Sequence, residues 1–278
     1  MILNIFEEIN KLSMGDRVQT YIFIFSFVFM VFSSLGWVLE LLFRRFFSAK
    51  RWVNPGFLTG PCLPIYGIGV LSLTIYVLAL LPAKPYFPNE ILFDVVIVLG
   101  IGILMTLIEL VGGLIFIKKM NIRLWDYSKR LGNYKGIICP LFSLIWMVMG
   151  ALFYFFLFDH IVILVTKFVT LDWFTLAVFL MGIYYGVLII DFAHSLSLGK
   201  RLKKAAEESK FVIKWENFKE HIQMELKERH LKSSFISPFK SSLPLNEHLR
   251  QFLNKNNCEK WEKTEDNEKT VENDSKAD

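Results

Sequence analysis

The chain has 278 residues, of which 54% are hydrophobic, and its mean hydropathy is +0.42. It holds more apolar side chains than one soluble core needs, which excludes an ordinary soluble domain and predicts a membrane protein. The net charge of +5 fits topology and attraction to a membrane surface, so it gives no reason to expect a nucleic-acid partner.

Five stretches are each long enough for the ~20 apolar residues that a membrane-spanning helix requires. They cover residues 20–43, 63–81, 91–117, 136–158 and 172–196. We expect an all-α fold, a polytopic membrane helix bundle of about five transmembrane helices within residues 20–198 that contacts the lipid bilayer, preceded by an N-terminal segment at 1–19. The first stretch is too long for a signal peptide, and no small-residue cleavage site follows it.

Basic residues are distributed unevenly among the segments that join these stretches. Fourteen follow the first stretch, follow the third or begin the tail: Arg44, Arg45, Lys50, Arg51, Lys118, Lys119, Arg123, Lys129, Arg130, Lys135, Lys200, Arg201, Lys203 and Lys204. Four lie on the other side: Lys11, Arg17, Lys84 and Lys167. The positive-inside rule therefore places the N-terminus outside and the C-terminus in the cytoplasm, in a bacterial cell (plasma) membrane with several crossings.

The segment WVNPGFLTGPCLPIYGIG, residues 52–69, joins the first two stretches and is dense in Gly and Pro without any charge. Backbone that enters a bilayer outside a regular helix must be buried in protein or line a wet cavity. Gly56 and Gly60 allow close approach of another backbone, while Pro61 and Pro64 suit the first turn of a helix. We expect a tightly packed turn into the second span at the cytoplasmic face.

The first two long loops share an order of landmarks, each beginning with a Glu and ending with a Pro. The two series are Glu40, Trp52, Asn54, Gly60, Pro64 and Glu109, Trp125, Asn133, Gly136, Pro140. One interpretation is a parallel repeat of helices 1–2 and 3–4, with the fifth helix added. Chance alignment in an apolar, Gly-rich chain is the other, and the sequence leaves both open.

Two acids lie inside apolar stretches. Glu109 is about 13 Å along its helix from Lys118, and a carboxylate at that depth costs at least ~2–3 kcal/mol, so it must be paired, protonated or facing a polar cavity. A structural hydrogen bond to a Ser, Tyr or Trp of another helix is the alternative to a functional role. Glu40 can form an interface salt bridge with Arg44, four residues on.

Other acids have simpler explanations. Asp94 and Asp191 lie near helix ends, where solvation is expected, although Asp191 and His194 could form a small polar lock. In LWDYS an aromatic belt explains Trp125 and Tyr127, and a cap or turn explains Asp126, unless Asp126 is functional.

The tail changes character at about residue 199. Apolar residues recur at helical spacing among Lys and Glu over residues 200–232, which predicts one amphipathic helix within a cytoplasmic tail region at 199–240. That helix either lies on the inner membrane surface or docks a partner protein. Residues 241–278 have the composition of a largely disordered tail.

Four motifs together resemble a known family: GWVLE at 36–40, VNPGFLTGPCLPIYGIG at 53–69, TLIEL at 106–110 and LWDYS at 124–128. They are similar to the bacterial putative ABC-transporter type IV (CmpB-like permease) family, over roughly residues 20–150. The resemblance implies a polytopic plasma-membrane protein of about five spans with a permease role. Pro55 stands where a basic residue is expected, and the tail lies outside the resemblance.

The candidate binding or pathway residues come from these motifs and from the two loops. They are Glu40, Asn54, Gly56, Gly60, Pro61, Pro64, Tyr66, Glu109, Trp125, Asp126 and Asn133. No GxxxxGK[ST] occurs in the sequence, so an ATP-driven function would need a separate ATPase subunit. Three cysteines without a CxxC pair and five scattered histidines give no sign of a metal site, a cofactor or a disulfide framework.

Three functional classes remain from the sequence. The favoured one is a transporter permease component for a small polar solute, which is not an enzyme. The alternatives are a non-catalytic membrane scaffold that recruits partners through its tail, and a membrane enzyme or binder acting on lipid headgroups. No nucleophile or metal motif supports the enzyme further.

Overall fold

The computed structural model describes residues 11, 13–47, 50, 52–161, 163, 174–209, 211–228 and 259–260. The chain divides into two compact units. The first consists of Met1–Gly112 with Tyr127–Ser195, and the second of Gly113–Asp126 with Leu196–Asp278. Each unit is described by itself.

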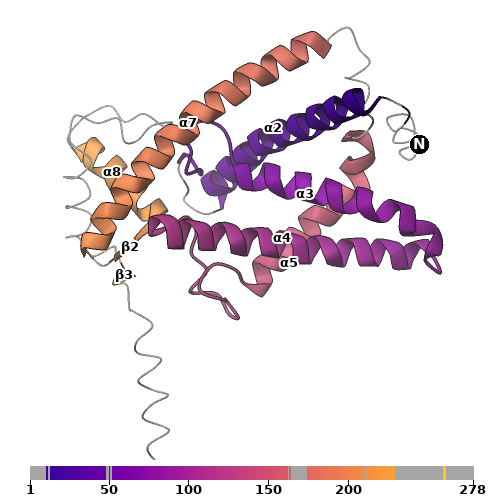
Figure 1. Ribbon diagram of the computed structural model, residues 1–278. Helices are drawn as coiled ribbons and strands as arrows, with labels where there is room; N and C mark the ends of the chain where they lie inside the picture. The colour runs from indigo at the N-terminus through magenta and orange to yellow at the C-terminus, as the bar shows by residue number, and fades with distance from the viewer. Residues whose placement is uncertain are drawn as a thin grey trace, which may run out of the picture. The chain divides into compact units, whose positions relative to one another are not determined.

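Long apolar helices make up the first unit, and the C-terminal ends of two of them, α4 and α7, are assigned to the second (Figure 1). They are α2 (Met14–Phe46), α3 (Pro64–Leu80) with the 3-10 helix η1 (Leu81–Tyr86), α4 (Glu90–Met120), α5 (Pro140–Leu152) with the π-helix η2 (Phe153–Leu157), and α7 (Phe174–Ser209). Five helical segments in the described residues are long and apolar enough to cross a membrane. This confirms the expected all-α polytopic bundle of five spans.

Proline marks the start of two of these helices. Pro64 is the first residue of α3 and Pro140 the first of α5. The missing N–H of proline costs nothing at this position, because the first N–H groups of a helix have no intrahelical partner. The sequence anticipated this use for Pro64.

Helices α2 and α3 lie side by side through glycines (Figure 1). A Cβ atom at Gly67 would lie 2.9 Å from the carbonyl oxygen of Phe29, so the two backbones nearly touch there. Helices α4 and α5 also meet at glycines, because a Cβ at Gly102 would lie 3.0 Å from Met147. Small residues at such crossings let membrane helices pack by van der Waals contact.

The apolar core of the first unit is built by α3, α4 and the fourth span. Its buried members are Leu73, Val77, Phe93, Ile97, Ile101, Met105, Phe153 and Phe158. Many other large apolar side chains of these helices are exposed, among them Leu99, Ile103 and Leu107 on α4. An apolar exterior around an apolar core is what a bundle in hydrocarbon requires.

Two tyrosines attach α7 to α2. The hydroxyl of Tyr184 is 2.8 Å from Ser33 Oγ, and Tyr185 Oη donates to the carbonyl oxygen of Ser26 at 2.8 Å. Ser33 is fully buried. Polar contacts of this kind between spans are favourable because hydrocarbon offers these groups no other partner.

The second unit contains short strands and a helix. Strand β1 (Ile122–Arg123) pairs in parallel with β2 (Phe211–Lys214), which pairs antiparallel with β3 (Glu259–Lys260). Helix α8 (Trp215–Glu228) follows β2 directly. Ile122 lies opposite Ile213, and both side chains are fully buried.

The expectation of one amphipathic helix over residues 200–232 is wrong. Helix α7 runs on to Ser209, a strand follows, and α8 is a separate helix. The physical reason is the run Phe211-Val-Ile, whose β-branched and aromatic side chains favour extended backbone once β1 is available as a partner. Residues 229–232 and, apart from 259–260, the predicted disordered region 241–278 lie outside the described residues.

The apolar side of α8 is buried. Trp215, Phe218 and Ile222 are almost completely buried, and Nζ of Lys219 lies 5.7 Å from the Trp215 ring centroid. An interfacial helix needs these side chains free to enter the headgroup region. The side of the tail that was expected to meet a membrane or a partner is therefore occupied in this structure.

Candidate functional site

The end of α2 and the start of α3 place Glu40 beside Tyr66. Tyr66 Oη donates to Glu40 Oε2 at 3.0 Å, and Arg44 Nε donates to Glu40 Oε1 at 3.1 Å. The Glu40–Arg44 ion pair that the sequence allowed is therefore present, with the arginine side chain only 11% exposed. Both oxygens of Glu40 are used, and its charge is balanced by Arg44.

Gly36 makes room for the Tyr66 ring. A Cβ atom at Gly36 would overlap Cβ and Cγ of Tyr66. Gly36 lies one helical turn before Glu40 on the same side of α2, so the gap it leaves puts the tyrosine next to the carboxylate. Sequence analysis quoted this glycine in a motif without assigning it a role.

Glu109 lies in the middle of α4 and is only 3% exposed. Tyr127 Oη, from the loop after α4, donates to Glu109 Oε1 at 2.9 Å. The other oxygen, Oε2, is buried and has no hydrogen-bond partner among the described residues. A buried acceptor left in this state costs roughly 1–3 kcal/mol, and more when it is charged.

Trp146 on α5 connects the two carboxylates. Its ring packs edge-on against Tyr66, with ring centroids 5.3 Å apart. The indole also lies close enough to interact electrostatically with the Glu109 carboxyl group. Within the described residues, however, Trp146 Nε1 makes no hydrogen bond of normal geometry. We call Glu40, Tyr66, Glu109, Tyr127 and Trp146 the acidic cluster.

The cluster behaves as one electrostatic unit. The carboxylates of Glu40 and Glu109 each interact electrostatically with the hydroxyl groups of both Tyr66 and Tyr127. In the loop, burial raises the pKa of the Tyr127 hydroxyl well above its usual range, and the charge of Glu109 raises it further. Tyr127 therefore stays protonated at physiological pH and remains a hydrogen-bond donor to Glu109. Its ring is fixed by stacking on Phe142, at a centroid distance of 4.3 Å.

Asn54 holds the Gly/Pro segment in shape. It is 4% exposed, and its Nδ2 donates to the carbonyl oxygens of Leu58 and Thr59 at 3.2 and 2.9 Å. Its Oδ1 accepts from the N–H of Gly56 at 3.3 Å and from Trp37 Nε1 at 2.9 Å. These contacts give Asn54 and Gly56 a structural role in the turn into the second span.

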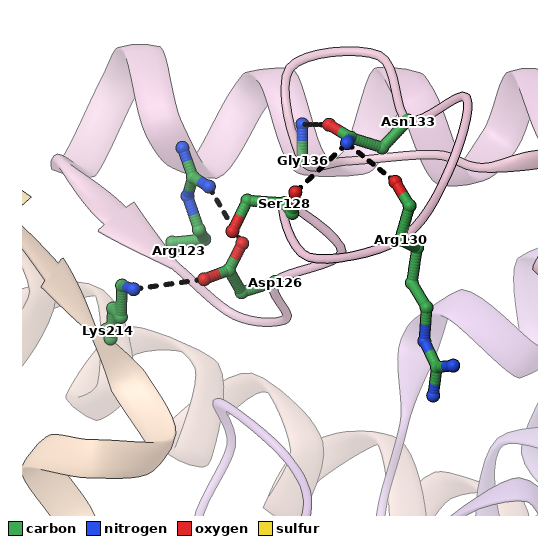
Figure 2. A network of polar contacts seen from close by, with 7 residues as sticks. All are labelled: Arg123, Asp126, Ser128, Arg130, Asn133, Gly136 and Lys214. Atoms are coloured by element: carbon green, nitrogen blue, oxygen red, sulfur yellow. Dashed lines mark hydrogen bonds and ion pairs between the residues drawn. The ribbon is translucent and has the colours of Figure 1, made fainter.

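Asn133 does the same in the second loop (Figure 2). Its Nδ2 donates to the carbonyl oxygens of Ser128 and Arg130, at 3.1 and 2.8 Å, and its Oδ1 accepts from Gly136 N–H at 3.0 Å. Each asparagine thus binds two loop carbonyl groups and one glycine N–H. This shared pattern supports the repeat hypothesis, which stays a prediction.

Asp191 of α7 binds the Gly/Pro segment through backbone groups. Thr59 N–H donates to Oδ1 at 3.0 Å and Gly60 N–H donates to Oδ2 at 2.7 Å. Ser195 Oγ lies 3.4 Å from Oδ1. The expectation of a solvated helix end is wrong for Asp191, because two backbone donors of another segment occupy its carboxylate.

Comparison with known proteins assigns the chain to one family. The family described as Putative ABC-transporter type IV matches residues 27–196, more than half of the chain. The chain belongs to this family. No curated protein and no solved structure matches it. The match takes in every residue of the acidic cluster and Asp191.

The remaining candidates in this type IV family member are placed less centrally. Pro61 is exposed and Trp125 is half-buried. Asp126 belongs to the second unit, where its Oδ1 lies 3.0 Å from Arg123 Nη1 and its Oδ2 lies 3.1 Å from Lys214 Nζ (Figure 2). Asp126 is thus used in an ion-pair network with basic residues of its own unit.

The structure therefore brings three of the sequence candidates of this family member into one site: Glu40, Tyr66 and Glu109. Sequence analysis missed Trp146 and Asp191 as site residues, and it treated Tyr127 only as part of a belt. Tyr127 could have been found as one of the tyrosines able to satisfy Glu109. Trp146 gives no such signal, since it stands in a uniformly apolar run. Among the described residues no group of His, Cys, Asp or Glu is suited to a metal ion.

Proposed function

We propose that this protein is the permease component of a transporter for a small polar solute, and that the acidic cluster binds that solute. The observation that supports this most is Glu109 Oε2, a buried carboxylate oxygen in a membrane-spanning helix that has no hydrogen-bond partner among the described residues. Acidic residues inside spans are costly, and they mark ion or substrate pathways in membrane proteins.

The hydrogen-bonding groups around Glu109 suit a small polar ligand. Within the described residues neither Glu109 Oε2 nor Trp146 Nε1 has a hydrogen-bond partner of normal geometry, although the indole acts on the carboxylate from nearby. A solute with polar hydrogens can satisfy the carboxylate, while the rings of Tyr66 and Trp146 supply an apolar wall. Tyr127 and Arg44 fix the two carboxylates in place, which limits the entropy lost on binding.

Energy from ATP would come from a separate ATPase subunit, because the sequence has no phosphate-binding loop of the Walker type. The family description supports such a partner. We place the protein in the bacterial plasma membrane, with its N-terminus outside and its C-terminus in the cytoplasm. The excess of Lys and Arg after the first and third spans and at the start of the tail supports this orientation.

The test compares cells that lack the protein with cells complemented by the native chain, Glu109→Gln or Glu90→Gln. Glu90 is the matched control, because it is on the same helix and its side chain is 81% exposed. We expect the uptake of at least one small polar solute, measured by mass spectrometry of cells and medium, to depend on the native chain and on Glu90→Gln. Glu109→Gln should lose most of this uptake while reaching the membrane in equal amount.

Two results would contradict the proposal. Solute pools that do not differ between cells with and without the native chain would remove the transport function. Equal uptake by Glu109→Gln and the native chain would remove the acidic cluster as the binding site. Crosslinking in the native membrane tests the partner separately, because a co-purifying subunit with a Walker motif is expected.

A further inference from the structure

The two carboxylates of the acidic cluster differ in charge balance. Glu40 has Arg44 at 3.1 Å. Glu109 has only the uncharged Tyr127 and Trp146 acting on it within the described residues. An ionised Glu109 would therefore leave the cluster with one uncompensated negative charge inside the membrane, a state that is strongly disfavoured.

One positive charge resolves this imbalance, and either a proton or a monovalent cation can supply it. We propose that Glu109 holds a proton in the empty site, and that the solute is a small ammonium-type cation which binds Glu109 in exchange for that proton. The inference rests on the proposed function and names its substrate class. One proton leaves as one cation arrives, so the charge of the cluster is unchanged.

The chemistry of the cluster favours an ammonium group over a metal cation. Ca²⁺ and Mg²⁺ take a shell of six or more oxygen ligands, whereas within the described residues Oε2 of Glu109 is the one carboxylate oxygen of the cluster without a hydrogen-bond partner. Aromatic rings attract organic cations through their faces, and Tyr66 and Trp146 pack against each other beside the carboxylates. A cation with N–H groups can bond to Oε2 while its carbon atoms contact these rings.

The hydrogen bond from Tyr127 makes the exchange reversible. It goes to Oε1, so Oε2 is the oxygen left to take a proton or a cation. When the O–H bond at Oε2 breaks, the carboxylate that forms is already stabilised by Tyr127.

The other charged and titratable groups around Glu109 come from α2, α3, the loop after α4, and α5. On α2 Arg44 is ion-paired with Glu40, and on α3 the Tyr66 hydroxyl donates a hydrogen bond to Glu40. The Tyr127 hydroxyl of the loop stays neutral, and α5 contributes the uncharged Trp146. Cys139, the residue before α5, is a buried free cysteine that also acts on Tyr127. The proposal assigns the exchangeable proton to Glu109, because Glu109 lacks an ion-pair partner within the described residues.

Infrared spectroscopy of the purified full chain in detergent tests the proton directly. At neutral pH we expect the absorption of a protonated carboxyl group in the native chain and in Glu90→Gln, and its loss in Glu109→Gln. Ethylammonium chloride should remove this absorption and release about one proton per chain into a weak buffer. Sodium chloride at the same ionic strength should leave the absorption unchanged.

Each other outcome overturns part or all of the inference. A native chain without protonated carboxyl absorption, or a Glu109→Gln variant that keeps it, would show that Glu109 holds no proton. Loss of the absorption with sodium chloride, or no loss with ethylammonium, would show that the ligand is not an ammonium cation. Binding is measured without transport, so failure here leaves the uptake experiment to decide the proposed function.

Tyr127→Phe provides a second variant in case Glu109→Gln does not fold. Without the donor to Oε1 the ionised carboxylate is less stable, so Glu109 should keep its proton to higher pH than in the native chain. The infrared absorption followed against pH measures this shift. An unchanged midpoint would contradict the assignment of the proton to Glu109.

Discussion

The first and second loops of the chain use similar residues in different ways. In both, an asparagine binds two carbonyl groups and a glycine N–H. The first loop is bound by another helix, through Asp191, while the second closes on itself through the bond from Tyr127 N–H to the carbonyl oxygen of Gly136. The loop closed in this way presents Tyr127 to Glu109, while Phe142 of α5 holds the tyrosine ring by stacking.

The acids that precede the two loops, Glu40 and Glu109, also differ in their partners. Glu40 is neutralised by Arg44, one turn away, whereas Glu109 lies too deep in its helix for Lys118 to reach. If the repeat is real, corresponding acids make different contacts. Within the described residues the deeper acid, Glu109, keeps an oxygen without a hydrogen-bond partner, and we expect function at that acid.

The first test changes the packing of the Tyr66 side chain against Gly36. Gly36→Ala should lower the free energy of unfolding by about 1–3 kcal/mol or more, because the new methyl group overlaps the base of the Tyr66 side chain. Gly182→Ala on α7 is the matched control, since nothing lies within 4 Å of the added methyl group. Thermal unfolding in detergent measures both, and equal stabilities would contradict the close packing of α2 and α3.

A pair of substitutions tests whether the asparagines are equivalent. Asn54→Ala should lower the free energy of unfolding by about 2–4 kcal/mol. Asn54 is buried, so water cannot replace the hydrogen bonds that its backbone partners would lose. Asn133→Ala should lower the free energy of unfolding by about 1–2 kcal/mol, because Asn133 is half-buried and water can replace the side-chain amide. Thermal unfolding again provides the measurement. A larger loss of stability for Asn133→Ala than for Asn54→Ala would contradict this expectation.

The smallest effect is expected at alkaline pH. The pKa of Tyr127 is raised in the folded chain, so the folded protein keeps a proton that the unfolded chain releases above about pH 10. Stability is fully present below that pH and falls above it by up to ~1.4 kcal/mol per pH unit for this group. Tyr127→Phe should reduce the slope of stability against pH, measured by unfolding between neutral and strongly alkaline pH. An unchanged slope would show that Tyr127 is not buried against Glu109.

The sequence predicted those features that depend on local composition. Five spans follow from length and hydropathy, and the pairing of Glu40 with Arg44 follows from helical spacing. Features that depend on distant partners were missed. Asp191 binds backbone N–H groups, which all residue types except proline carry, so the sequence does not reveal which of them it binds. The strand at 211–214 exists because β1 is available to pair with it, so helical periodicity alone misled the prediction.

The pairing of β1 with β2 also has a consequence for biosynthesis. About 90 residues separate the two strands, and they include the fourth and fifth spans. At the usual rate of translation, β1 leaves the ribosome roughly 5 to 18 seconds before β2 exists. During this interval Ile122 has no strand beside it, and the second unit can form only after the last span has been made. A chain that ends before residue 211 would leave β1 without the strand that it pairs with in the complete protein.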